Sequence, residues 1–103
     1  MVFQETPVFT KLILSLMDDE LYRDLQNSLI VRPDAGDLIE GTGGIRKLRW
    51  KLPGTGKRGG ARVIYYWRVS EDQILMLLVY PKATKDDLSP AEKKHLRTIV
   101  EKW

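Results

Sequence analysis

The chain has 103 residues and no cysteine, which fits one domain and excludes a disulfide framework and a thiolate metal site. It carries 17 Lys and Arg residues against 14 Asp and Glu residues, a net charge of +3. Its longest apolar run, residues 74–80, is far shorter than the roughly 20 residues that a membrane-spanning helix needs. No signal peptide is predicted in residues 1–9. We therefore expect one cytoplasmic domain, residues 1–103, that makes no contact with a membrane.

The positive charge is concentrated in the middle of the chain. Residues 1–44 carry three basic and eight acidic side chains, and residues 71–103 carry six of each kind. Residues 45–70 carry eight basic side chains and no acidic one. Such a segment is a candidate surface for a polyanion such as RNA. A solvated basic hairpin explains the charge run alone about equally well.

The first third of the chain predicts a strand followed by two helices. Residues 2–5 alternate apolar and polar side chains, as a short strand does. Thr6 and Pro7 suit the N-cap and first position of a helix, and apolar residues follow at helical spacing. The acidic residues 18–20 favour the start of a second helix, which ends at Arg32-Pro33. Together they predict a helical hairpin packed on a sheet.

The middle of the chain predicts three consecutive strands. Residues 45–52 alternate, with one face formed by Ile45, Lys47, Arg49 and Lys51 and the other by Arg46, Leu48, Trp50 and Leu52. Residues 60–69 form the next strand. Its core face is expected to hold Ala61, Val63, Tyr65, Trp67 and Val69, and its other face Arg62, Ile64, Tyr66 and Arg68. Residues 70–73 form a turn, and residues 74–80 form a buried strand.

The last element is a helix that begins with a capping box formed by Ser89 and Glu92, with Pro90 at its first position. The predicted order is β-α-α-β-β-β-α. It indicates an α+β domain with a small, largely antiparallel four-stranded sheet, an N-terminal helical hairpin and a C-terminal helix.

Several kinds of site are disfavoured. A phosphate-binding loop needs a glycine five residues before Gly56 and a Ser or Thr after Lys57, but Lys51 and Arg58 stand there and a strand follows. His95 is the only histidine, so neither a serine triad nor a histidine metal site can be assembled. The acidic pair at residues 86–87 is explained by the start of the last helix. We therefore predict no metal and no cofactor.

Three segments resemble the RelE/ParE superfamily of bacterial toxins, with the HigB-like branch as the nearest. They are GTGGIRKLRW at residues 41–50, KRGGARVIYYW at residues 57–67 and VYPKATKDDLS at residues 79–89. The resemblance implies a RelE-like fold and the toxin of a type II toxin–antitoxin system. It implies a metal-independent endoribonuclease, an mRNA interferase, which inhibits translation by cutting mRNA in the ribosomal A site. Cleavage by 2′-hydroxyl attack leaves a cyclic phosphate and a free 5′-hydroxyl.

The resemblance also implies partners and site residues. The partners are the ribosome, mRNA and a HigA-like antitoxin with a helix-turn-helix. The toxin is expected to contact operator DNA only through this antitoxin. The catalytic set falls on Lys47, Arg49, Arg62 and Lys82. The family's next arginine and a later tyrosine are replaced here by Ala83 and Ser89, so Lys85 is the candidate for the missing cation and Tyr66 or Tyr80 for a phenol. Contacts to RNA or the ribosome are expected from Arg46, Lys57, Arg58, Tyr66 and Arg68.

The chemistry agrees with a basic site. Attack by the 2′-hydroxyl of RNA needs a base for its proton, cations for the nonbridging oxygens and an acid for the 5′-oxygen. Two other functions stay open at this stage. One is a ParE-like toxin that inhibits gyrase, which the basic sheet face disfavours; the other is a non-catalytic module that binds RNA or the ribosome.

Overall fold

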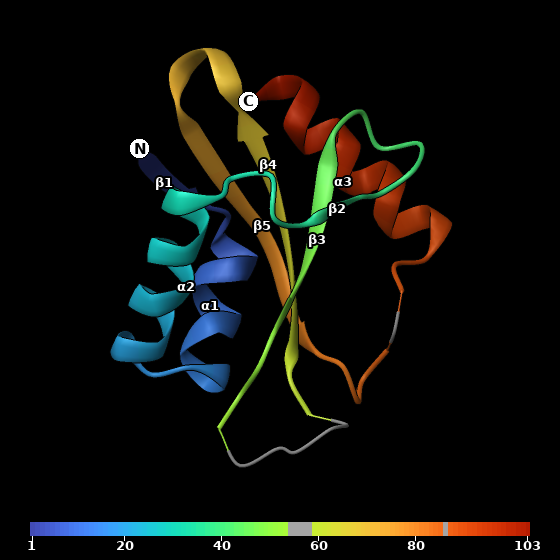
Figure 1. Cartoon of the computed structure of the whole chain (residues 1–103). Helices are drawn as coiled ribbons and strands as arrows, with labels where there is room; N and C mark the ends of the chain where they lie inside the picture. Colours follow the sequence, from blue (N-terminus) through green and yellow to red (C-terminus); the bar gives the residue numbers. More distant parts are fainter. Residues whose placement is uncertain (54–58, 86) are drawn as a thin grey trace.

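The computed structural model describes residues 1–53, 59–85 and 87–103, and within them three α-helices cover both faces of a five-stranded sheet (Figure 1). The elements are β1 (Val2–Glu5), α1 (Pro7–Leu16), α2 (Asp19–Val31), β2 (Asp37–Leu38), β3 (Ile45–Trp50), β4 (Ala61–Arg68), a 3₁₀ turn (Val69–Glu71), β5 (Gln73–Pro81) and α3 (Pro90–Lys102). The order of strands across the sheet is β1-β5-β4-β3-β2. The α+β class and the predicted order of the main elements are confirmed.

The expected four-stranded, largely antiparallel sheet is wrong in two details. A two-residue strand, β2, pairs antiparallel with β3 and forms one edge. The other edge, β1, pairs with β5 in parallel, from Val2 opposite Gln73 to Glu5 opposite Met76. Parallel neighbours need a long crossover, and here the whole chain from α1 to β4 supplies it. The sheet is therefore mixed.

The predicted helix starts are confirmed by their capping contacts. The Thr6 hydroxyl accepts from the amide of Phe9 at 3.1 Å, and Pro7 follows at the first helical position. The Asp18 carboxylate accepts from the amide of Leu21 at 2.8 Å. At α3, Ser89 and Glu92 form the reciprocal capping box. Each contact satisfies a backbone donor that has no partner within its helix.

The sheet has two buried faces. On the helical-hairpin face, Phe9 and Leu25 of the hairpin pack with Val63 and Tyr65 of β4. On the α3 face, the buried residues are Ile45, Ile64, Leu75, Leu77, Tyr80, Leu88 and Leu96. Figure 1 shows α1 and α2 on one side of the sheet and α3 on the other. The predicted division of β3 and β4 into two faces is confirmed up to Trp67. Val69 is 66% exposed, because β4 ends at Arg68 and Val69 begins the 3₁₀ turn.

The glycine-rich entry to β3 is a tight turn held by Thr42. Its hydroxyl donates to the carbonyl of Ile39 at 2.6 Å and accepts from the amide of Ile45 at 3.2 Å. Gly41 and Gly43 flank it with φ values of 79° and 76°, a region that glycine enters without steric cost. The turn therefore fixes where β3 begins, and with it which side chains of β3 reach the α3 face.

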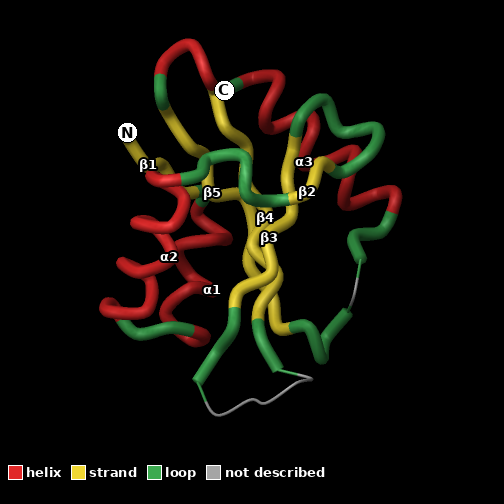
Figure 2. Tube along the Cα trace, in the orientation of Figure 1, coloured by secondary structure: helices red, strands yellow, loops and turns green. Residues whose placement is uncertain are grey.

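Both termini lie at the end of the sheet where β4 turns into β5 (Figure 2). The amino group of Met1 is 3.2 Å from the Asp72 carboxylate, and Trp103 packs on Arg68. In the described part of the chain, no helix is long and apolar enough to cross a membrane.

Candidate active site

Three of the predicted catalytic residues lie together on the α3 face. Arg49 of β3 is directly opposite Arg62 of β4, and Lys47 of β3 is opposite Ile64, two residues along the strand. Ile45 and Ile64 are buried on this face. Since side chains alternate along a strand, Lys47, Arg49 and Arg62 point to the same side as these two isoleucines.

Exposure differs sharply among the three cations. Arg62 is only 6% exposed, whereas Lys47 is half-buried and Arg49 is exposed. Among the described residues, no carboxylate lies within ion-pair distance of the Arg62 guanidinium. A buried charge without an ion pair is costly, so a buried arginine in this state suits a site whose anion arrives from outside.

One acidic side chain reaches this group of cations. The Nζ atom of Lys47 is 2.7 Å from Oδ1 of Asp87, in the segment between β5 and α3. The hydrogen bond from Lys47 lowers the pKa of Asp87, and the charges of Lys93 and Arg62 lower it further. Lys93, in the first turn of α3, is thus near enough for its charge to act on Asp87. We call Lys47, Arg49, Arg62 and Lys93 the basic cluster.

Sequence reasoning missed the part that Asp87 and Lys93 play here. It assigned the acidic pair at residues 86–87 to the start of the last helix, but α3 begins at Pro90 with Ser89 as its cap. Asp87 bonds to Lys47 instead, 40 residues earlier in the chain. The capping box, which fixes the start of α3, was the one signal available for placing Lys93.

Lys82 and Lys85 lie beyond β5. The amide of Lys82 donates to the carbonyl of Gly60 at 3.0 Å, which places Lys82 beside the start of β4. Lys85 forms an ion pair with Glu92, and its Nζ atom lies 4.9 Å from the centre of the Tyr80 ring. The hydrogen bond from Lys85 lowers the pKa of Glu92. The charge of Lys85 is therefore already matched, and its contacts tie the segment before α3 to that helix.

Tyr66 and Arg68 lie toward the other end of β4. The Tyr66 ring meets the Trp103 ring edge to face, with 6.2 Å between ring centres. The Arg68 guanidinium lies 3.9 Å from the centre of the Trp103 ring and bonds to Glu71 at 2.9 Å. Arg68 is six residues from Arg62, about 20 Å along a strand. These contacts fasten the C-terminal end of α3 to the sheet and direct both side chains toward Trp103, and Arg68 lies apart from the basic cluster.

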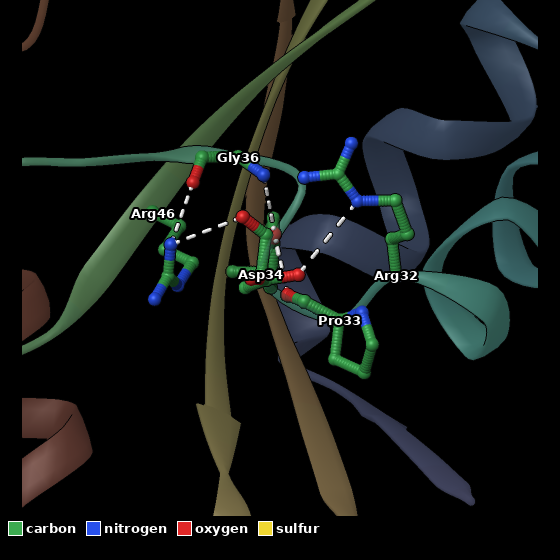
Figure 3. Close-up of polar contacts among 6 residues, drawn as sticks. Arg32, Pro33, Asp34, Gly36 and Arg46 are labelled. Atoms are coloured by element: carbon green, nitrogen blue, oxygen red, sulfur yellow. Dashed lines mark hydrogen bonds and ion pairs between the residues drawn. The ribbon is translucent and has the colours of Figure 1, made fainter.

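Arg46 lies on the opposite, helical-hairpin face of β3. Its guanidinium donates to the carbonyls of Gly36 at 2.8 Å and Asp34 at 3.2 Å (Figure 3). Arg46 therefore holds the segment between α2 and β2 in place and is not part of the basic cluster. The remaining two predicted RNA contacts, Lys57 and Arg58, lie outside the described residues.

A cleft of about 420 Å³ lies between the start of α1, β5 and α3, and its lining is mostly apolar. Its lining residues include His95 and Glu92 but no member of the basic cluster. Within the described ranges, no group of three His, Asp or Glu side chains is placed to hold a metal ion. The ammonium and guanidinium groups of the basic cluster suit phosphate oxygens.

Comparison with known protein families gives a match over residues 11–103. The matching family is described as the RelE toxin of the RelE / RelB toxin-antitoxin system. The match spans β3, β4, β5 and α3, and so includes every residue of the basic cluster together with Asp87.

Proposed function

Because the chain belongs to the RelE toxin family, we propose that this toxin is a ribosome-dependent endoribonuclease of the HigB-like branch, which cuts mRNA in the A site. Toxins of this family pair with an antitoxin and are generally mRNA-cleaving enzymes. The observation that supports the finer proposal most is the opposed pair of Arg49 and Arg62, one exposed and one buried without an ion pair among the described residues.

The proposed reaction is attack by a ribose 2′-hydroxyl on the adjacent phosphorus. The bond from phosphorus to the 5′-oxygen breaks, giving a 2′,3′-cyclic phosphate and a 5′-hydroxyl. Negative charge develops on the two nonbridging oxygens, and Arg49 and Arg62 each offer paired donors that fit them. Electrostatic stabilisation of this kind is usually the largest single contribution to catalysis.

Lys47, which lies beside the two arginines, is the candidate for proton transfer or for a further contact to the phosphate. Its strand position is two residues from Arg49 on the same face, and its side chain is 22% exposed. Lys93 approaches from α3, and Lys82 lies beside the start of β4. We assign Lys82 to substrate contact at the edge of the site, and Lys85 to holding the segment before α3.

The partners proposed for this chain are the ribosome, mRNA and a HigA-like antitoxin with a helix-turn-helix, and the place of action is the cytoplasm. A protein that acts only as a gyrase inhibitor has no need for cations converging on one sheet face. The neighbouring open reading frame offers an inexpensive test of the partner. Its product should copurify with the toxin and carry the DNA-binding segment.

The decisive experiment maps mRNA 5′ ends after the toxin is induced. We expect new ends inside codons of translated messages, and none when translation initiation is blocked. The test variant is Arg62→Ala, which removes the buried guanidinium. Its matched control is Lys11→Ala, which removes an exposed charge from α1. Growth arrest with unchanged 5′ ends and a loss of DNA supercoiling would contradict the nuclease and favour the gyrase alternative.

A further inference from the structure

The contact between Lys47 and Asp87 joins two distant parts of the chain at the candidate site. The 2.7 Å hydrogen bond links β3 to the segment before α3. The side chain of Lys47 is 22% exposed and that of Asp87 is 75% exposed. A lone surface ion pair contributes little to stability, so the position of this pair is its more informative property.

Asp87 is the one described carboxylate that contacts the basic cluster. Lys47, Lys93 and Arg62 all favour its charged form. The carboxylate leaves the cluster with an excess of three positive charges, so the site still attracts a phosphodiester. Among the described residues, Asp87 is within ion-pair distance of Lys47 alone, so it occupies neither arginine.

We propose that Asp87 is a positioning residue, which holds the Lys47 ammonium in the orientation that the scissile phosphate of RNA requires. This inference depends on the nuclease function proposed above. Lysine has a long side chain with many rotamers, and fixing them before the reaction removes an entropic cost from the transition state. One N–H of the ammonium bonds to Asp87, and the other two remain for the substrate.

A competing interpretation of the same contact predicts the opposite effect of removing Asp87. If the carboxylate occupied the place of a phosphate oxygen, it would have to leave before RNA bound, and its removal would strengthen binding. Two observations favour positioning. Asp87 engages the lysine and neither arginine, and its side chain is 75% exposed, so the cations do not enclose this carboxylate.

The test is single-turnover cleavage of mRNA on programmed 70S ribosomes by the purified full-length toxin. The variants are Asp87→Ala, Asp87→Asn, Lys47→Met and the double variant Lys47→Met/Asp87→Ala. Glu101→Gln, which breaks the exposed ion pair with Arg97 on α3, is the matched control. Thermal unfolding of each variant checks folding, and Asp87→Asn, which keeps the shape of the side chain, serves if Asp87→Ala fails to fold.

We expect Asp87→Ala to lower the rate at saturating ribosomes about 10- to 100-fold, the size of effect that misplaced catalytic groups produce, with little change in the ribosome concentration for half-maximal rate. Asp87→Asn should recover part of the rate, because its amide oxygen can still accept from Lys47. The double variant should be no slower than Lys47→Met, since Asp87 acts through Lys47. Glu101→Gln should match the wild type.

Three results would overturn the inference while leaving the nuclease intact. They are additive losses in the double variant, faster or tighter reaction in Asp87→Ala, and full activity in Lys47→Met. Failure of the wild-type toxin to cut mRNA on ribosomes would be a different outcome, because it would overturn the proposed function itself and the inference with it.

Discussion

Arg49 and Arg62 are directly opposed on the antiparallel strands β3 and β4, so two like charges occupy one cross-strand pair. Like charges at such a position destabilise a sheet. The pair shares its face of the sheet with the Lys47 side chain and with the buried apolar residues Ile45 and Ile64. An arrangement that lowers stability at the place where it concentrates charge is typical of a functional site.

Replacing one member of the pair should separate stability from activity. We expect Arg49→Thr to raise the free energy of unfolding by about 0.2–1 kcal/mol, because it removes a repulsive pair and threonine suits strands. The same variant should cut mRNA more slowly. Urea denaturation and ribosome-dependent cleavage measure the two effects. Lys51→Thr, an exposed charge just after β3, should change neither quantity much, and an Arg49→Thr protein that is less stable or fully active would contradict this account.

Arg62→Ala should abolish growth arrest. The buried guanidinium has no described carboxylate partner to leave unpaired, so the protein is expected to fold and to bind its antitoxin. Loss of one transition-state donor of this kind costs about 100- to 1,000-fold in rate. Growth after induction and copurification with the antitoxin are the measurements. Arg62→Lys keeps the charge but loses the paired donors, so it should be intermediate; full toxicity of Arg62→Ala would remove this residue from the site.

Much of the fold could be predicted because its signals are local. Thr6, Asp18 and Ser89 each cap a helix within three residues of themselves. The alternation of β3 and β4 correctly divided their side chains between the two faces, because one face of each strand is apolar along most of its length. That alternation is enough to place Lys47, Arg49 and Arg62 on one face of the sheet.

The parts of the fold and of the candidate site that the sequence did not predict depend on contacts between residues distant in the chain. β2 has two residues, too few for alternation to reveal, and the parallel pairing of β1 with β5 has no signal within either strand. Tyr66 and Arg68 follow the same alternation as Arg62, but their distance along β4 brings them to Trp103 instead. The bond from Lys47 to Asp87 spans 40 residues, and its formation depends on where the segment before α3 crosses the sheet.

The hydroxyl of Tyr65 should be a measurable source of stability. Within the core it accepts from the amide of Gly36 at 2.8 Å and donates to the carbonyl of Pro33 at 2.7 Å. Tyr65→Phe leaves both backbone groups without this partner, so we expect a loss of about 1–3 kcal/mol in the free energy of unfolding. Urea denaturation measures it, with Tyr66→Phe as the matched control on the other face. A loss no larger than that of Tyr66→Phe would show that water replaces the hydroxyl.

The ion pair of Glu92 with Lys85 should make stability depend on pH in one direction. The hydrogen bond from Lys85 and the capping contact from the Ser89 amide lower the pKa of Glu92 in the folded protein. A carboxyl whose pKa is lower when folded stabilises the fold above its unfolded pKa, about 4.3 for glutamate, and loses that contribution as the pH falls through the folded value. Glu92→Gln keeps an oxygen for the capping box but has no charge.

The thermal midpoint of Glu92→Gln should therefore lie below that of the wild type at neutral pH, and the gap should close as the solution becomes acidic. Ser89→Ala supplies the comparison, since its hydroxyl does not titrate over this range and is the smallest of the causes that lower the Glu92 pKa. Its loss should cost about 1 kcal/mol and depend only weakly on pH. Thermal unfolding at a series of pH values measures both variants. A gap between Glu92→Gln and the wild type that stays constant into acid would mean that the charge on Glu92 adds nothing to the fold, and that Lys85 is held before α3 by its contact with the Tyr80 ring.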